Sequence, residues 1–299
     1  MKKIISFSLY GNKPNFQIGA VVNAIEAVRV YPDWKCRFYT TDDDMICKQL
    51  EYLGAEVIRM DDWPEGQMFW RFLAVDDADV CLSRDVDSVV NEREAVAVND
   101  WLCNHNHQWH GMHDFYGHRK VSMMGGMWGY KHCQDKAKIP PNKTKFAQHR
   151  PVFNFREKSI RQYIREWLDG HPSRQLAGRN WDQQFLGDII YAERAQHNIK
   201  WSGDWDNAKG NHFLPHYPMR YGDFVGSYVF WEKGPQGDGV RPNGGGNGRR
   251  NLSQTVTGDN WLINIVKNWI HTGYSIENKD AIIESVKTII KRCGGNVKD

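Results

Sequence analysis

The stretch that decides the fold is Asp79-Val80-Cys81-Leu82-Ser83-Arg84-Asp85-Val86-Asp87-Ser88, a short apolar run that leads into two aspartates one residue apart. Side chains alternate between the two faces of an extended backbone, so Asp85 and Asp87 should point the same way. Two carboxylates directed at one point repel each other unless a proton or a cation lies between them. The spacing therefore predicts a site for a hard cation, Mg²⁺ or Mn²⁺, completed by substrate phosphates.

The neighbouring Arg84 adds a permanent positive charge that could reach a phosphate. The competing interpretation of the same residues is a solvated turn at the end of a strand, with no ligand.

Strands and helices alternate along the first part of the chain. Strands are expected at 3–9, 34–40, 55–60 and 79–83, and helices at 17–30, 41–53 (with Thr41 or Asp42 as the N-cap) and 67–75. This alternation predicts an α/β fold, a mostly parallel central sheet with helices on both faces. Ligands bind at the carboxyl ends of the strands in such sheets, so the Tyr10-Gly11 loop and the two aspartates should line one cleft.

The later part of the chain is less regular. Helices are expected at 91–102, 159–168 and 181–193, a strand at 108–113, and a glycine-bearing apolar segment at 121–129, where a ligand or another backbone approaches closely. Residues 201–251 look loop-like, 242–250 are low in complexity, and 261–270 and 280–292 look like two terminal amphipathic helices.

The composition is that of an ordinary globular protein: 299 residues, 40% hydrophobic, 25% charged, and a net charge of +3. This charge argues against a nucleic-acid partner, while 13 Trp and 12 Tyr permit a carbohydrate ligand without requiring one. The six cysteines form no C-x-x-C pair, and we expect reduced thiols, as in a cytoplasmic protein. We also expect no signal peptide and no transmembrane segment.

Four motifs, in order, carry a resemblance to a known family: Ser8-Leu9-Tyr10-Gly11, Asp85-Val86-Asp87, Gly125-Gly126-Met127-Trp128-Gly129, and Trp181-Asp182-Gln183-Gln184-Phe185-Leu186. The set resembles the nucleotide-sugar-dependent glycosyltransferases of the GT-A fold, especially small viral and bacterial members. The resemblance implies a GT-A-like (Rossmann-like) nucleotide-sugar-binding and catalytic domain over 1–220. Residues 221–299 would be a glycine-rich loop and a helical extension.

The resemblance also implies roles for particular residues. Asp85 and Asp87 would hold Mn²⁺ or Mg²⁺ against the diphosphate of a UDP- or GDP-sugar, with His216 (rather than His212) completing the metal shell. The nucleotide and its sugar would contact Ser8, Tyr10, Gly11, Arg84 and Asp85. The sugar and acceptor pocket would include Gly125, Gly126, Trp128 and Gln183.

Asp182 would be the base, or the carboxylate that orients the acceptor hydroxyl. Three of these residues have an ordinary structural alternative: a helix N-cap for Asp182, a loop histidine for His216, and a core side chain for Trp128. The sequence does not choose between an inverting and a retaining reaction.

Two other functions compete with sugar transfer. The segment 85–89 also matches the D-x-D-x-[TV] pattern of aspartate-nucleophile phosphatases, although that motif ends the first strand of its domain and here it follows the fourth. A non-catalytic sugar-binding protein on the same fold is the second rival, against which the intact aspartate pair argues. A nucleotidyltransferase usually has a glycine-rich phosphate loop after the first strand, of which residues 11–14 are a poor version.

Overall fold

The computed structural model describes residues 1–103, 107–114, 118, 121–132, 155–171, 180–191, 199–202 and 287. Several expectations lie outside this part of the chain: the domain boundary at 220, the low-complexity segment 242–250, the helix 261–270 and, apart from Lys287, the helix 280–292. His212 and His216 also lie outside it.

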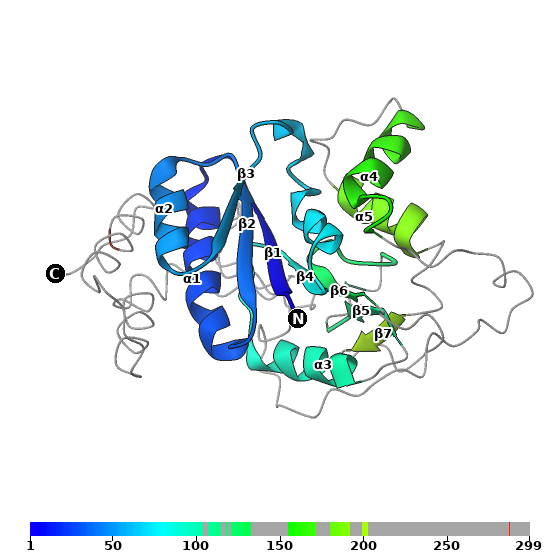
Figure 1. Ribbon diagram of the computed structural model, residues 1–299, viewed down its shortest axis with the longest axis horizontal. Helices are drawn as coiled ribbons and strands as arrows, with labels where there is room; N and C mark the ends of the chain where they lie inside the picture. The colour runs from blue at the N-terminus through cyan, green and yellow to red at the C-terminus, as the bar shows by residue number, and fades with distance from the viewer. Residues whose placement is uncertain are drawn as a thin grey trace, which may run out of the picture.

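The described residues form a seven-stranded sheet in the order β3-β2-β1-β4-β6-β5-β7 (Figure 1). β6 runs antiparallel to both of its neighbours, whereas the other neighbouring pairs are parallel. The strands are β1 (Lys3–Leu9), β2 (Lys35–Thr40), β3 (Glu56–Arg59), β4 (Val80–Arg84), β5 (Trp109–Met112), β6 (Met127–Lys131) and β7 (Ile199–Ser202). The predicted α/β class, a mostly parallel sheet flanked by helices, is confirmed.

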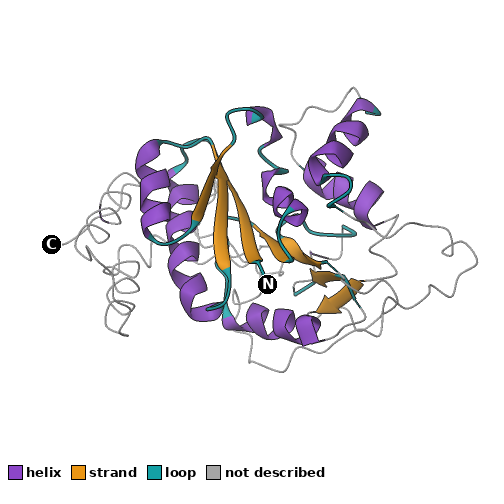
Figure 2. Cartoon of the chain, viewed as in Figure 1, coloured by secondary structure: helices purple, strands orange, loops and turns teal. Residues whose placement is uncertain are grey.

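Helical segments cover both faces of this sheet (Figure 2). One hydrophobic core joins β1, β2 and β4 to three helices: α1 (Pro14–Val30), α2 (Asp44–Tyr52) and α3 (Glu92–Cys103). The other core lies under the 3₁₀ helices η1 (Pro64–Gly66) and η2 (Trp70–Asp76), α4 (Ile160–Asp169), α5 (Trp181–Phe185) and the π-helix η5 (Leu186–Tyr191).

The central strand β1 explains why both faces must be covered. Ile5, Phe7 and Leu9 enter the first core, while Ile4 enters the second. β1 is therefore buried on both sides, and after Ile4 its residues on the second face are the buried serines Ser6 and Ser8.

Two details of the helices differ from the sequence prediction. The N-cap of α2 is Asp43, whose side chain accepts a hydrogen bond from the Ile46 N–H at 3.1 Å. Asp42 is occupied elsewhere, since its carboxylate accepts from the Asn12 N–H (3.0 Å) and from Gln17 Nε2 (3.3 Å). The segment 67–75, expected to be helical, begins its regular helix only at Trp70, in the 3₁₀ helix η2.

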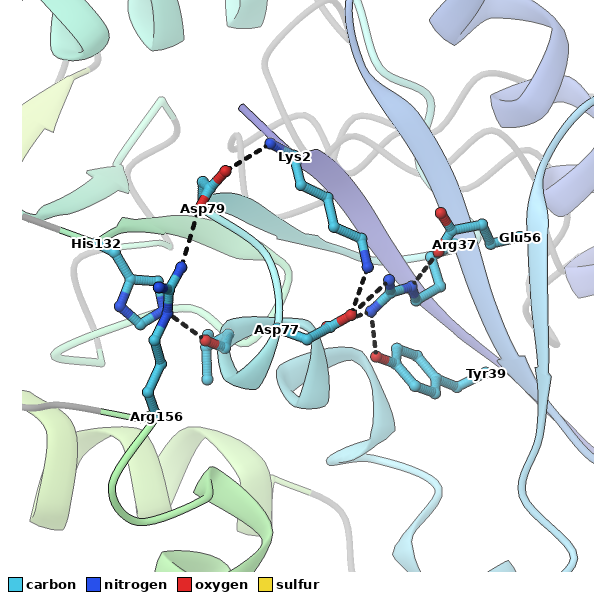
Figure 3. A network of polar contacts seen from close by, with 9 residues as sticks. Lys2, Arg37, Tyr39, Glu56, Asp77, Asp79, His132 and Arg156 are labelled. Atoms are coloured by element: carbon cyan, nitrogen blue, oxygen red, sulfur yellow. Dashed lines mark hydrogen bonds and ion pairs between the residues drawn. The ribbon is translucent and has the colours of Figure 1, made fainter. Parts of the chain in front are cut away.

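Towards the amino ends of the strands, an ion network joins residues of β2 and β3 to residues that precede β1 and β4 (Figure 3). The buried Arg37 binds Asp77, Glu56 and the Tyr39 hydroxyl at 2.7, 2.7 and 3.1 Å. On the exposed side of the network, Lys2 Nζ donates to Asp77 Oδ2 at 2.5 Å. These charges therefore neutralise one another at the edge opposite the predicted site.

The described thiols are free, with Cys36, Cys47 and Cys81 buried and Cys103 exposed. Among the described helices, none is long and apolar enough to cross a membrane.

Candidate active site

The register of the sheet brings the first two predicted motifs together. β1 pairs with β4 so that Phe7 lies opposite Arg84, which brings the following residues, Ser8 and Asp85, to the same edge. β2 lies on one side of β1 and β4 on the other, so the strand order reverses at this point. Such a reversal, at the carboxyl ends of parallel strands, is where open α/β sheets bind ligands.

Arg71, on η2, is the centre of the site. Its Nη1 lies 3.0 Å from Asp85 Oδ1, its Nη2 donates to Asp182 Oδ2 at 2.6 Å, and its Nε donates to the Gly125 carbonyl at 3.1 Å. The side chain of Arg71 is only 7% exposed, and that of Asp182 is fully buried. One guanidinium therefore ties together η2, the end of β4, the turn before β6, and α5.

Two serines fix the surroundings of this guanidinium, one through the Arg71 backbone and one through the carbonyl that Nε contacts. Ser8 Oγ accepts a hydrogen bond from the Arg71 backbone N–H at 3.0 Å, and Ser83 Oγ donates to the Gly125 carbonyl at 2.8 Å. Both side chains lie on the face of the sheet covered by η2, so the strands themselves fix the position of Arg71.

Gly125 and Gly126 make the close approach of these charges possible. A Cβ on Gly125 would lie 2.3 Å from Asp182 Oδ2, and one on Gly126 would lie 2.2 Å from Asp85 Oδ2. Real Cβ atoms do not approach oxygen so closely, so only glycine lets each carboxylate rest against the backbone here. The two glycines thus contact the charged cluster, and their predicted place in the sugar and acceptor pocket stays a prediction.

The charges in the site do not balance. Asp85, Asp87 and Asp182 face a single buried guanidinium, which leaves an excess of negative charge. Burial, and then the charge of Asp85, raises the pKa of Asp87 to about 7, despite the opposing effect of Arg71. Burial also raises the pKa of Asp182, against the lowering effect of Arg71.

The donor set suits a hard divalent cation. Asp85 and Asp87 offer carboxylate oxygens on one turn, and Mg²⁺ or Mn²⁺ is commonly held by one or two carboxylates with water and phosphate oxygens as the remaining ligands. Within the described ranges there is no group of three or more His, Cys, Asp or Glu side chains arranged to hold a metal. The predicted ligand His216 stays a prediction.

The loop after β1 has the conformation expected of a tight turn, with positive φ at Gly11 (+84°) and Asn12 (+47°). Tyr10 is half-buried, and its hydroxyl lies 3.1 Å from Met68 Sδ. The ring meets Phe16 and Trp70 edge to face. Burial raises the pKa of the Tyr10 hydroxyl, so Tyr10 offers a neutral aromatic surface beside the charged cluster.

Arg84 lies away from the predicted site. Its guanidinium is 3% exposed and faces α3, where Nε donates to Glu94 at 2.7 Å and Nη1 donates to the Trp128 carbonyl at 2.9 Å. Neighbouring residues of β4 point to opposite faces, and Ser83 already faces Arg71. The prediction that Arg84 contacts the donor is therefore corrected: the arginine beside the aspartates is Arg71.

Trp128 is a core residue, which was the structural alternative to a place in the sugar pocket. Its side chain is 1% exposed and packs on Phe72 and Trp109, with ring centroids 5.2 and 5.7 Å away. The prediction that it lines the sugar pocket is corrected accordingly.

Asp182 does not cap α5. The N-cap is Asn180, in the left-handed region (φ +67°) and without a side-chain cap bond, while Asp182 is bound by Arg71. Gln183, next to it, is half-buried at the start of the same helix.

Sequence reasoning missed Arg71, although the sequence contains a signal. It is the one charged residue in the otherwise apolar run Phe69-Trp70-Arg71-Phe72-Leu73-Ala74-Val75. A charged side chain in a buried run needs a partner of opposite charge.

Comparisons with known proteins give fold-level likenesses only. No family model and no curated protein matches the chain. Among solved structures, the chain is similar to the glycosyltransferase GlyE of Streptococcus pneumoniae TIGR4, at 13% identity and a TM-score of 0.41 over 67% of this chain and 45% of GlyE. The chain therefore spans less than half of GlyE.

A second solved structure is the galactosyltransferase LgtC in complex with donor and acceptor sugar analogs (13% identity, TM-score 0.39, 67% of this chain and 73% of LgtC). A third is the Mycobacterium tuberculosis glucosyl-3-phosphoglycerate synthase in complex with Mn²⁺, UDP and glucosyl-3-phosphoglycerate (14% identity, TM-score 0.31, 44% of this chain and 56% of the synthase). The first two of these solved structures are named as sugar transferases.

Gly126→Ala should displace Asp85, because the added Cβ would overlap its carboxylate. We expect Mn²⁺ affinity, measured by electron paramagnetic resonance of free Mn²⁺, to fall by about 10-fold or more, as for changes beside metal ligands. The control is Gly187→Ala, where the nearest atoms lie 4.0 Å from the added Cβ. Equal Mn²⁺ affinity in the two variants would contradict the role given to Gly126.

The raised pKa of Asp87 predicts a pH dependence of stability in chelated, metal-free buffer. The folded protein binds the Asp87 proton more tightly than the unfolded chain does, so this contribution is complete below about pH 4 and is lost as the pH rises towards about 7. Asp87→Asn should therefore gain stability relative to the parent protein over that range. Urea denaturation from pH 4 to 8 checks it, and parallel curves would refute it.

Proposed function

We propose that this chain is a metal-dependent glycosyltransferase that moves a sugar from a nucleotide-diphosphate donor, a UDP- or GDP-sugar, to an acceptor hydroxyl. The observation that carries the proposal is the Arg71 guanidinium held between Asp85 and Asp182, with Asp87 beside it, at the reversal of strand order. This arrangement combines an anion-binding group and a cation-binding group within a few ångströms, as a metal–diphosphate complex requires.

Asp85 and Asp87 would hold Mg²⁺ or Mn²⁺, which when bound would neutralise the negative charge that develops on the departing diphosphate. Burial and, second to it, repulsion by Asp85 raise the pKa of Asp87, and a bound cation would offset both, so metal and carboxylate would stabilise each other.

Arg71 would supply the second positive charge. A guanidinium presents several N–H donors in one plane, which suits phosphate oxygens. Its contacts with Ser8 and Gly125 orient it before any ligand arrives, so little entropy is lost when the donor binds.

The nucleotide would lie against the β1 loop, with Tyr10 as an aromatic surface for the base and with Ser8 and Gly11 near the ribose. Gln183, on α5, would contact the sugar or the acceptor.

Asp182 fits neither of the two predicted roles, base or orienter of the acceptor hydroxyl, as well as it fits that of a carboxylate that orients Arg71. Its side chain is fully buried, and Oδ2 is bound by Arg71, so an acceptor hydroxyl would have to displace that contact to deliver a proton. As the carboxylate that orients Arg71, Asp182 would act on the transition state, because negative charge on the diphosphate grows as the sugar leaves.

The first test is a thermal-shift screen of UDP, GDP and their sugars, with and without Mn²⁺. A ligand that binds the folded state raises its apparent stability, so we expect a metal-dependent shift with one nucleotide that Asp87→Ala abolishes. The control is Asp33→Ala, an exposed aspartate beside β2. A shift only with a phosphate-mimicking anion and Mg²⁺ would favour the phosphatase, and no shift at all would contradict the transferase.

Asp182→Asn should lower kcat far more than donor affinity, by roughly 10²-fold or more, since a transition-state contact would be weakened. The control is Asp188→Asn on η5, an exposed residue whose substitution keeps an acceptor for Trp167 Nε1. Steady-state kinetics with the donor identified by the screen would measure both. Equal losses in kcat and in donor affinity would instead point to a purely structural role for Asp182.

A further inference from the structure

Asn23 is a polar side chain within an otherwise apolar stretch of α1. It lies in the middle of α1, is 0% exposed, and is surrounded in sequence by Val21, Val22, Ala24 and Ile25. Asparagine is a poor helix former, about 0.6 kcal/mol worse than alanine, and a buried amide is costly unless it is hydrogen-bonded. Its presence on this apolar face therefore needs a physical reason.

The reason is a set of hydrogen bonds to the loop that carries the two aspartates. Nδ2 donates to the Ser88 carbonyl at 2.7 Å and lies 3.3 Å from the Val86 carbonyl, while Oδ1 accepts from the Val90 N–H at 3.1 Å. Nδ2 also donates to the Gly19 carbonyl of its own helix at 2.9 Å. The loop itself dictates which end of the amide points where, since a backbone N–H only donates and a carbonyl only accepts.

These contacts surround Asp87. Val86 and Ser88 are its two neighbours in the chain, so Asn23 contacts the backbone on both sides of it. Ser88 in turn donates from its N–H (3.3 Å) and its Oγ (3.1 Å) to the Asp85 carbonyl, which closes the turn between the aspartates. The backbone of the Asp85–Val90 loop is therefore fixed to α1 by one side chain.

Such fixation opposes an electrostatic force. Asp85 and Asp87 repel each other while both are charged, and a free loop would relax by separating them. A loop anchored from behind keeps the two carboxylates at one point before the cation arrives, which lowers the cost of assembling the site.

We propose that Asn23 is a positioning residue for the cation site: it holds the backbone on both sides of Asp87 so that Asp85 and Asp87 converge. The inference rests on the proposed function in that these two aspartates bind the metal. Asn23 itself contacts neither metal nor substrate.

The test compares Mn²⁺ affinity in the whole chain, measured by electron paramagnetic resonance with Mn²⁺ alone and with UDP or GDP added. Asn23→Ala should weaken Mn²⁺ binding by about 10- to 100-fold, the usual effect of removing a group that supports metal ligands. The matched control is Ile25→Ala on the same helix, 1% exposed, which loses core packing and stability but no hydrogen bond to the loop, since the isoleucine side chain has no polar atom.

A second variant keeps the test informative if Asn23→Ala does not fold. Asn23→Asp keeps the shape of the side chain and the acceptor for the Val90 N–H, and loses the amide donor to the loop and to the Gly19 carbonyl. Its added negative charge would by itself favour a cation, so weaker Mn²⁺ binding in this variant would report altered geometry.

The outcomes separate the two proposals. Weaker Mn²⁺ binding in a folded Asn23 variant, with unchanged affinity in Ile25→Ala, supports the positioning role. Parent-like affinity in a folded Asn23 variant, or an equal loss in Ile25→Ala, overturns that role and leaves the transferase standing. Absence of Mn²⁺ binding by the parent chain under every condition overturns both.

Discussion

One buried guanidinium controls the arrangement of this site. Arg71 binds carboxylates from the end of β4 and from α5, which are about a hundred residues apart in the chain, and it also binds the turn before β6. Removing it would leave Asp182 buried and charged without a counter-ion, a situation that proteins avoid at considerable cost. The packing of η2 and α5 over the sheet therefore depends on the same guanidinium that positions the carboxylates of the candidate site.

The support for this contact comes from both faces of the sheet. Ser8 and Ser83 face η2 and fix Arg71, while Asn23 reaches the aspartate loop from α1 on the other face. On that second face Arg84 and Glu94 form a buried ion pair directly behind the aspartates. The charged groups of the site thus rest on rigid elements, with a separate layer of polar contacts behind them, which is how precise sites are generally built.

The fold was largely predictable because its signals are local. The alternation of apolar runs with amphipathic segments locates β1, β2, β4, α1 and α3, and the spacing of Asp85 and Asp87 identifies the site from a few residues. Arg84 was misassigned because a sequence does not say which face of β4 an arginine takes. Trp128 was misassigned because an aromatic side chain suits a sugar surface and a core equally. Arg71 and Asn23 were missed because their partners lie 14 to 111 residues away.

The reversed direction of β6 has a consequence for how this architecture tolerates change. A parallel strand contributes its end to the edge of the sheet where Asp85 lies, whereas β6 contributes its beginning, the Gly125-Gly126 turn. Its last residue, Lys131, pairs with Val80 at the opposite edge. The segment entering β6 therefore has a fixed length and shape at the charged cluster, whereas the last residue of β6 lies at the edge away from it. For evolution or engineering, the start of β6 is therefore more constrained by the charged cluster than its end is.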